Sequence, residues 1–288
     1  MPEYKAPLRD FKFVMQEFLD CESHYQNLGY EDASLDMIDA ILSEAAKFTE
    51  QVIAPINQIG DQQGCQWNEG EVTTPDGFKE AYQQYVEGGW PTLAQDIEFG
   101  GQGLPHSLNT VISEMFAAAN HSFAMYPGLS HGAIATIERY GSKLQKDMFL
   151  PHLIDGTWTG TMCLTEAHCG TDLGLLRTKA EPNEDGSYRL NGSKIFISAG
   201  EHDLSDNIVH IVIARIPGSP EGTKGISLFA VPKHNIDDTG NTINPNGVNC
   251  GSIEHKMGIH GNSTCVINFD DAKGYLIGEV NKGLRCMF

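Results

Sequence analysis

The stretch Met162-Cys-Leu-Thr-Glu-Ala-His-Cys-Gly-Thr-Asp-Leu-Gly174 marks the point where this 288-residue chain changes character. Apolar and polar residues alternate over 158–164, which is typical of a β-strand. Small, hydroxyl-bearing and glycine residues follow, so we expect a turn at the end of that strand. Backbone amides at such a turn, with the hydroxyls of Thr165 and Thr171, can bind a ring carbonyl or a phosphate oxygen. The threonines could equally satisfy only the local backbone.

The residues before this stretch show mainly helical periodicity. Apolar residues recur at three- and four-residue intervals from Ser34, a suitable N-cap, to Ile53, and Pro55 bounds the pattern. Other helices are predicted over 11–19, 75–87, 107–126, 132–140 and 143–150. We therefore expect residues 1–155 to form an N-terminal helical domain, with an extension over about 1–33.

The residues after this stretch read as strands joined by turns. Residues 188–198 surround Asn191-Gly192, a strong hairpin signal, and are predicted to form two strands. Further strands are predicted over 208–216, 225–231 and 263–269. The expected fold class is α+β, in which an all-helical domain precedes an antiparallel, barrel-like β domain over 156–275.

Residues 276–288 read as the start of a third element. Their last eight residues favour helix, yet they end on the apolar pair Met287-Phe288 with nothing after it to pack against. We therefore expect the chain to be truncated before a C-terminal helical bundle.

Composition and motifs exclude several classes of protein. Lys and Arg number 19 against 38 Asp and Glu, and the net charge of −19 disfavours nucleic acid and anionic membrane surfaces as partners. No apolar run reaches membrane-spanning length and no leader is evident, which predicts a cytoplasmic protein. The seven cysteines include no Cys-x-x-Cys pair, so we expect reduced thiols and no bound metal. Neither a dinucleotide fingerprint nor a P-loop is present.

Three ordered segments resemble the conserved motifs of the acyl-CoA dehydrogenase family. The first is the stretch from Met162, and the second is Asn191-Gly-Ser-Lys-Ile-Phe-Ile-Ser-Ala-Gly200. The third is Lys256-Met-Gly-Ile-His-Gly-Asn-Ser-Thr264, followed by Phe269 and Leu276-Ile-Gly-Glu279. The similarity covers nearly the whole chain. Residues 164–180, Ala199-Gly-Glu-His-Asp203 and Tyr4-Lys-Ala-Pro7 are most similar to the longer bacterial subfamily that contains 3-methylmercaptopropionyl-CoA dehydrogenase.

This resemblance implies an activity, a cofactor and partners. The activity is FAD-dependent α,β-dehydrogenation of an acyl-CoA thioester, with 3-methylmercaptopropionyl-CoA as a candidate substrate and an electron-transfer flavoprotein as the acceptor. It implies a role in fatty acid metabolism or dimethylsulfoniopropionate degradation, and a homo-oligomer at full length. Three alternatives stay open: an alkylation-response flavoprotein associated with DNA, an acyl-CoA oxidase, and a flavin-free α+β scaffold.

The resemblance also assigns roles by matching position. Met162, Leu164 and Thr165 would contact the isoalloxazine ring, and Gly170 and Thr171 would lie at the flavin pyrophosphate side, with Thr171 also contacting the acyl-CoA. Phe196 would cover the ring, where core packing is the alternative, with Ile197 beside it and Ser198 bonding near flavin N5. Residues 120–131 would line the acyl pocket. The family's catalytic glutamate lies in a following domain, so no catalytic residue is assigned and the chain alone is expected to be inactive.

Three polar residues of the first motif invite a catalytic role. Cys169 could be a nucleophile, but no neighbouring residue in the sequence marks a partner that would lower its pKa. Glu166 and Asp172 could be catalytic carboxylates, but we expect them to bond the turn and the strand end instead.

Overall fold

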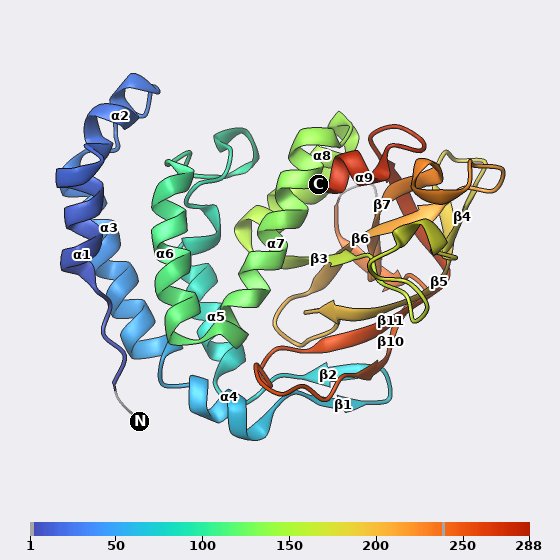
Figure 1. Cartoon of the computed structure of the whole chain (residues 1–288), viewed down its shortest axis with the longest axis horizontal. Helices are drawn as coiled ribbons and strands as arrows, with labels where there is room; N and C mark the ends of the chain where they lie inside the picture. The colour runs from blue at the N-terminus through green and yellow to red at the C-terminus, as the bar shows by residue number, and fades with distance from the viewer. Residues whose placement is uncertain (1–2, 238–239) are drawn as a thin grey trace.

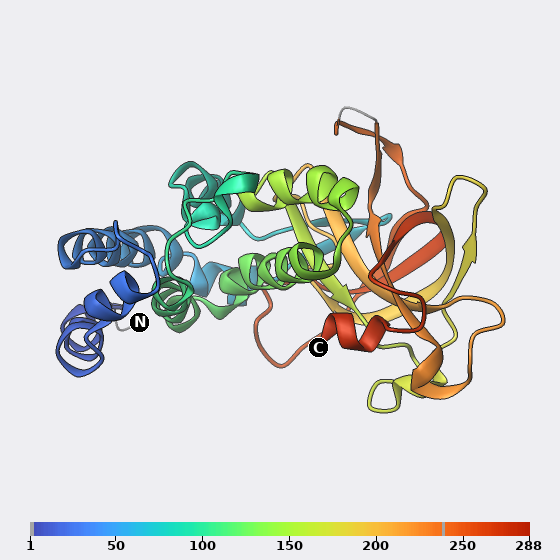
Figure 2. The ribbon, with the colours of Figure 1, turned by 90° about the horizontal axis from the view of Figure 1, so that it is seen from above.

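The computed structural model describes residues 3–237 and 240–288 and places helices and strands in separate halves of the molecule (Figure 1). Seen from above, α7 and α8 lie between the N-terminal helices and the strands (Figure 2). No described helix combines the length and the apolar character needed to cross a membrane. The helices are α1 Leu8–Lys12, η1 Phe13–Phe18, α2 Cys21–Asn27, α3 Leu35–Phe48, η2 Thr49–Ile53, α4 Asn57–Gln63, α5 Phe78–Glu87, η3 Trp90–Thr92, η4 Ile97–Phe99, α6 His106–Ala119, α7 His121–Tyr140, α8 Lys143–Asp155, η5 Leu173–Leu175, η6 Gly222–Gly225 and α9 Gly283–Met287.

A break at Asn120 divides the predicted helix over 107–126. Asn120 has an extended backbone (φ −158°, ψ 90°), and its side chain accepts a hydrogen bond from the Phe123 amide. It therefore caps α7 just after α6 ends. The single helix predicted over 107–126 is wrong, and the separate helix predicted over 132–140 is the second half of α7.

The strands form one large sheet and two small hairpins. They are β1 Gln66–Asn68, β2 Glu71–Thr73, β3 Trp158–Cys163, β4 Lys179–Pro182, β5 Tyr188–Ser198, β6 Asn207–Arg215, β7 Ile226–Pro232, β8 His234–Ile236, β9 Thr242–Pro245, β10 Val248–Ile253 and β11 Thr264–Ile277. The seven-stranded sheet runs β10-β11-β5-β4-β6-β3, and β7 pairs with both β11 and β6.

The sheet is mixed rather than antiparallel, which corrects the prediction. β3 pairs with β6 in parallel along its whole length, and β4 also runs parallel to β6. The chain between β3 and β6 adds β4 and β5, which is the long connection that parallel neighbours require. The barrel-like closure stays a prediction, because β4 and β6 share a single residue pair, Lys179 and Arg215.

The Asn191-Gly192 pair lies within a strand and not in a hairpin turn. β5 is continuous from Tyr188 to Ser198, so the predicted hairpin is wrong. Gly192 is instead the residue at which β11 shifts its register against β5, and the Asn191 side chain donates to Asp271 at 2.8 Å. A β-bulge also favours glycine and asparagine, so the local signal is the same for both structures.

α7 joins the helices to the sheet. The Gly160 amide of β3 donates to Ser130 Oγ at 3.0 Å, and a Cβ atom on Gly160 would lie 2.4 Å from the Ala133 side chain. Only glycine allows this close approach. Earlier in α7, the buried Tyr126 hydroxyl donates to the Gly261 carbonyl (3.1 Å) and accepts from the Ser263 amide (3.2 Å). α7 therefore holds the strand half at two separate points.

Replacing Tyr126 by phenylalanine should destabilise the protein by about 1–3 kcal/mol, because it leaves a buried carbonyl and a buried amide without their partner. Tyr85→Phe is the matched control, since burial alone shifts the pKa of Tyr85 and no hydrogen bond contributes. The free energy of unfolding in urea measures both changes. Equal losses in the two variants would show that this contact does not couple the halves.

Candidate functional site

A buried ion pair anchors the turn after β3. Lys194 of β5 has no exposed surface, and its ammonium donates to Glu166 Oε1 at 2.9 Å and to the Leu164 carbonyl at 2.9 Å. Glu166 also accepts from the Thr178 hydroxyl and amide, and from the Arg177 amide at 2.7 Å. These bonds tie both ends of the 164–178 segment to one carboxylate.

The environment keeps Glu166 ionised. Burial acts to raise the pKa of the carboxyl, but the Lys194 charge and the hydrogen bonds of Thr178 outweigh it, so the pKa lies below its ordinary value. A buried carboxylate that accepts this many bonds is structural. The prediction that Glu166 bonds the turn is confirmed.

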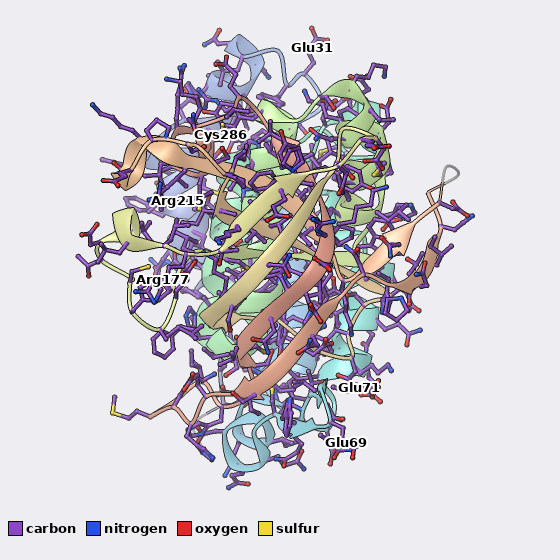
Figure 3. The ribbon with its side chains drawn as sticks, turned by 90° about the vertical axis from the view of Figure 1, so that its right-hand side faces the viewer. Glu31, Glu69, Glu71, Arg177, Arg215 and Cys286 are labelled. Atoms are coloured by element: carbon purple, nitrogen blue, oxygen red, sulfur yellow. The ribbon has the colours of Figure 1, made fainter. Side chains whose placement is uncertain are left out.

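A second anchor holds the far end of the same segment. Arg215 lies at the end of β6 and donates to the carbonyls of Gly174 (2.6 Å), Leu176 (3.2 Å) and Gly222 (2.7 Å). Its side chain and that of Arg177 lie on the same side of the strands (Figure 3). Asp172 accepts from the Gly174 amide at 3.0 Å, so its predicted role in the turn is also confirmed.

Two of the predicted ring-contacting residues, Thr165 and Phe196, lie close together where the end of β3 meets β5. The Ile195 amide donates to the Thr165 carbonyl at 2.8 Å, which brings the end of β3 beside Phe196. Phe196 is 58 % exposed and Ser198 is partly exposed, whereas the Ile197 side chain is buried in the sheet core. Only the backbone of Ile197 could therefore contact a ligand on this face.

The backbone of this face is held in a rarely adopted conformation. Phe196 and Ala199 have left-handed φ angles of 60° and 52°, on either side of Ile197-Ser198. Such a conformation costs about 1–3 kcal/mol at a non-glycine residue and is concentrated at functional sites. The register shift between β5 and β11 at this point turns Phe196 outward. An exposed phenylalanine on a strained backbone is poor core packing, so it favours the predicted role of covering a ligand.

The other predicted contacts surround this face. Met162 and Leu164 are half-buried against the core between α7, α8 and the sheet, while Gly170 and Thr171 are exposed in the turn. Apolar groups therefore lie at one end of the face, and a hydroxyl and exposed backbone lie at the other. An apolar surface next to polar groups suits a ligand in which a ring is followed by a phosphate chain.

Lys194 is the residue of this site that sequence reasoning missed. It lies between Ser193 and Ile195 in a strand, within the second family motif. Its phase in the strand puts it on the buried face, together with Leu190. A lysine at a buried strand position needs a carboxylate partner, and Glu166 in the facing turn was the available signal.

Glu166, His168 and Cys169 form a compact group of metal-ligand types within the described residues. The Glu166 oxygens are already bonded to Lys194 and to the backbone. His168 Nε2 lies 3.0 Å from the Leu175 carbonyl, which requires a proton on that nitrogen. The ammonium of Lys194 supplies the positive charge here, and these donors do not suit a metal.

Cys169 is a poor nucleophile. Its side chain is 7 % exposed, and burial followed by the Glu166 charge raises the pKa of its thiol. This agrees with the interpretation of Cys169 as an inert thiol of the turn.

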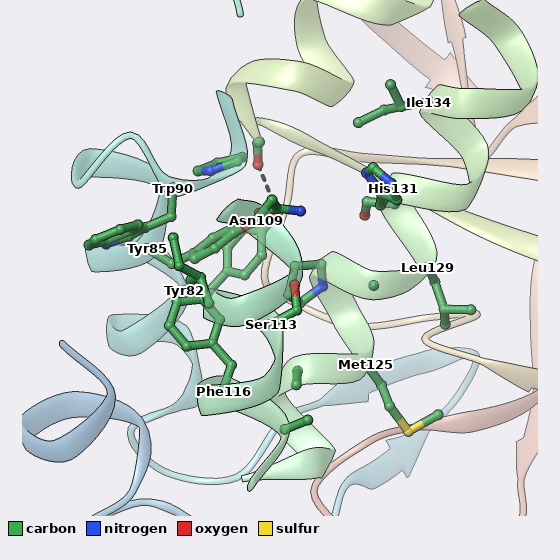
Figure 4. Close-up of a pocket in the computed structure, with 18 of the residues that line it drawn as sticks. Tyr82, Tyr85, Trp90, Asn109, Ser113, Phe116, Met125, Leu129, His131 and Ile134 are labelled. Atoms are coloured by element: carbon green, nitrogen blue, oxygen red, sulfur yellow. Dashed lines mark hydrogen bonds between the residues drawn. The ribbon is translucent and has the colours of Figure 1, made fainter. Parts of the chain in front are cut away.

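An apolar cavity of about 340 Å³ lies between α5, α6 and α7 (Figure 4). Tyr85, Trp90 and Phe116 form its aromatic wall, and Met125 and Leu129 of α7 face them. The polar groups on its walls include Asn109, Ser113 and His131. Eight of the predicted acyl-pocket residues line it, namely His121, Ala124, Met125, Pro127, Gly128, Leu129, Ser130 and His131.

The chain matches two family models in sequence. Residues 36–157 match "Acyl-CoA dehydrogenase, N-terminal domain", and residues 161–272 match "Acyl-CoA dehydrogenase, middle domain". It is 44% identical to 3-methylmercaptopropionyl-CoA dehydrogenase of Ruegeria pomeroyi over 99% of this chain and 48% of that protein. It is 37% identical to a butyryl-CoA dehydrogenase of Syntrophomonas wolfei over 99% of this chain and 49% of that protein. The chain therefore belongs to the acyl-CoA dehydrogenase family, and it spans about half the length of these relatives.

Solved structures agree in fold. An acyl-CoA dehydrogenase complexed with FAD from Bacillus anthracis aligns with a TM-score of 0.70 at 27% identity, over 89% of this chain and 40% of that one. A chain from the electron transferring flavoprotein structure of Acidaminococcus fermentans aligns with a TM-score of 0.69 at 26% identity, over 86% and 60%. The relatives named as acyl-CoA dehydrogenases are oxidoreductases. We propose that the helical domain ends at residue 155 and the strand domain at residue 275.

Replacing Lys194 by methionine should cost about 3–5 kcal/mol in stability, because it leaves Glu166 charged and unpaired in the interior. The double variant Lys194→Met/Glu166→Gln should lose less than the sum of the two single variants, since the amide keeps an acceptor for Thr178. Urea unfolding of the four proteins gives the coupling energy.

Lys143→Met is the control for this cycle, because Lys143 pairs with Asp147 on the surface and its loss should cost below about 1 kcal/mol. Additive losses in the double variant would show that Lys194 and Glu166 do not depend on each other.

Proposed function

We propose that the full-length protein is an FAD-dependent acyl-CoA dehydrogenase, and that this chain supplies its flavin face and its acyl cavity. The observation that carries the proposal is the exposed, left-handed Phe196 beside Ser198 and Thr165 on the outer side of the sheet. FAD, when bound, accepts the hydride that leaves the acyl Cβ. Its role here is supported by family membership and by the FAD complex of the Bacillus anthracis relative.

The residues present fit a flavin. The Phe196 ring offers a flat apolar surface of the kind that packs on an isoalloxazine, and the Ser198 and Thr165 hydroxyls can bond polar atoms at its edge. Thr171 and Gly170 lie in the exposed part of the turn, where the backbone can approach a phosphate chain. The Glu166–Lys194 pair holds these groups in place before any ligand arrives.

The acyl chain is proposed to enter the cavity between α6 and α7. The lining is mostly apolar, which suits a hydrocarbon or thioether chain. α7 separates this cavity from the flavin face, since Gly128 and Leu129 line the cavity while Gly132 lies beside Met162. A substrate could therefore have its reacting carbons at the ring and its chain in the cavity.

The substrate and the electron acceptor are the finer parts of the proposal. The Ruegeria pomeroyi relative supports 3-methylmercaptopropionyl-CoA as the substrate, and the Syntrophomonas wolfei relative makes butyryl-CoA the first comparison. An electron-transfer flavoprotein is the proposed acceptor, supported by the Acidaminococcus fermentans structure. We assign the base that removes the α proton to no residue of this chain.

The test is to express the complete reading frame and to record the visible spectrum of the purified protein. Anaerobic addition of 3-methylmercaptopropionyl-CoA should bleach an oxidised flavin band, because hydride transfer reduces the ring. Butyryl-CoA and palmitoyl-CoA, added in parallel, rank the acyl chains. A colourless protein, or a yellow one that none of the thioesters bleaches, would refute the proposal, and peroxide release in air would identify an oxidase.

The variant Ser113→Phe tests the cavity. A phenyl ring at this wall fills space that a long chain needs, so kcat/KM for the longest accepted acyl-CoA should fall roughly tenfold or more. The shortest accepted substrate should change little, and Ser113→Ala is the matched control. An equal loss for all chain lengths would place the acyl chain elsewhere.

A further inference from the structure

Lys256 is a half-buried cation without a carboxylate. Its ammonium donates to the Asn262 carbonyl and to Thr264 Oγ1, the latter at 2.9 Å. No ion pair among residues 3–237 and 240–288 includes Lys256. Burial lowers the pKa of Lys256, and the nearby thiols of Cys65 and Cys265 act to raise it. In a chain with twice as many acidic as basic residues, an uncompensated lysine is unusual.

Two other lysines of the strand half, one buried and one partly exposed, show the contrast. Lys194 pairs with Glu166 at 2.9 Å, and Lys233 pairs with Glu201 at 2.6 Å. Each of these charges is cancelled by its partner, so its field falls off quickly with distance. The charge of Lys256 is not cancelled, and part of its surroundings is protein rather than water.

The strand register places this charge on the proposed flavin face. Thr264 of β11 pairs with Ser198 of β5, and residues directly opposite each other point to the same side of a sheet. Their Cβ atoms are therefore about 5 Å apart. Lys256 bonds the Thr264 side chain, so its ammonium lies on the same side as the Ser198 hydroxyl.

Hydrogen bonds hold the ammonium beside a cavity. Lys256 and Thr264 line this cavity of about 500 Å³, which lies between residues 61–67 and the 253–264 segment and is also lined by Asp61 and Glu254. The Asn262 and Thr264 bonds fix the ammonium at the strand ends, so it does not swing freely into solvent. A fixed, unpaired charge at the edge of a low-dielectric region acts over a longer range than a surface lysine.

We propose that Lys256 supplies an uncompensated positive charge that raises the reduction potential of the flavin bound at Ser198 and Phe196. This inference rests on the proposed function. Reduction adds electron density to the flavin ring, so a nearby cation stabilises the reduced form relative to the oxidised form. Lys256 would not touch the reacting atoms, and its effect would be on the driving force of hydride transfer.

The experiment compares flavin midpoint potentials in the full-length holoprotein, measured by equilibration with a reference dye. Lys256→Met should shift the equilibrium about tenfold toward the oxidised form, which is about 30 mV more negative for a two-electron couple. Lys256→Arg keeps the charge and should stay near the wild-type potential. Lys79→Met removes an exposed lysine from α5 and is the matched control.

Two outcomes would overturn the inference. A potential of Lys256→Met equal to that of Lys79→Met would overturn the inference while leaving the proposed function intact, provided that acyl-CoA still bleaches the flavin. An equal shift in Lys256→Arg and Lys256→Met would also overturn it, because loss of packing and not loss of charge would then be the cause. If Lys256→Met does not retain flavin, Lys256→Gln replaces it, and the same criterion applies.

Discussion

The buried contact between Lys194 and Glu166 is the constraint on which the site depends. The turn that follows β3 has no regular hydrogen-bond ladder over most of its length. The ion pair replaces that ladder, because Lys194 binds the Leu164 carbonyl at one end and Glu166 binds the Arg177 and Thr178 amides at the other. The lysine comes from β5, the same strand that carries Phe196 and Ser198. One ion pair therefore fixes the position of the turn relative to the strand. A buried ion pair contributes little net stability, so positioning is the better account of its presence.

α7 performs a similar role on a larger scale. It begins at the Asn120 cap, lines the apolar cavity with one part of its length and packs on β3 with the next. Ser130 and Gly160 bring helix and strand into close contact without a spacer side chain. The cavity and the strand face thus share one wall, and any rotation of α7 would change both. This shared wall connects the helical half to a site whose strained residues, Phe196 and Ala199, lie at the end of β5.

Sequence reasoning predicted the parts of this architecture that depend on local signals. The helical periodicity after Ser34 indicated the right element because apolar spacing reports on burial. The alternation before Leu164 indicated a strand, although β3 is buried on both of its faces. The mixed pairing of β3 with β6 and the bulge at Asn191-Gly192 were missed, because both depend on which strand lies alongside. The family motifs brought the candidate residues to one face, but the partner of Lys194 and the isolation of Lys256 needed coordinates. Charge compensation is a property of neighbours in space, which a linear pattern does not contain.

The contact between Tyr126 and Gly261 has a consequence for biosynthesis. Its two partners are 135 residues apart in the chain. At a synthesis rate of roughly 5–20 residues per second, Gly261 is synthesised on the order of ten seconds after Tyr126. During that interval α7 can pack neither against the loop that contains Gly261 nor against the complete sheet, so its apolar side is exposed to solvent. The nascent helical half is therefore the form of this protein for which protection by a chaperone would matter most.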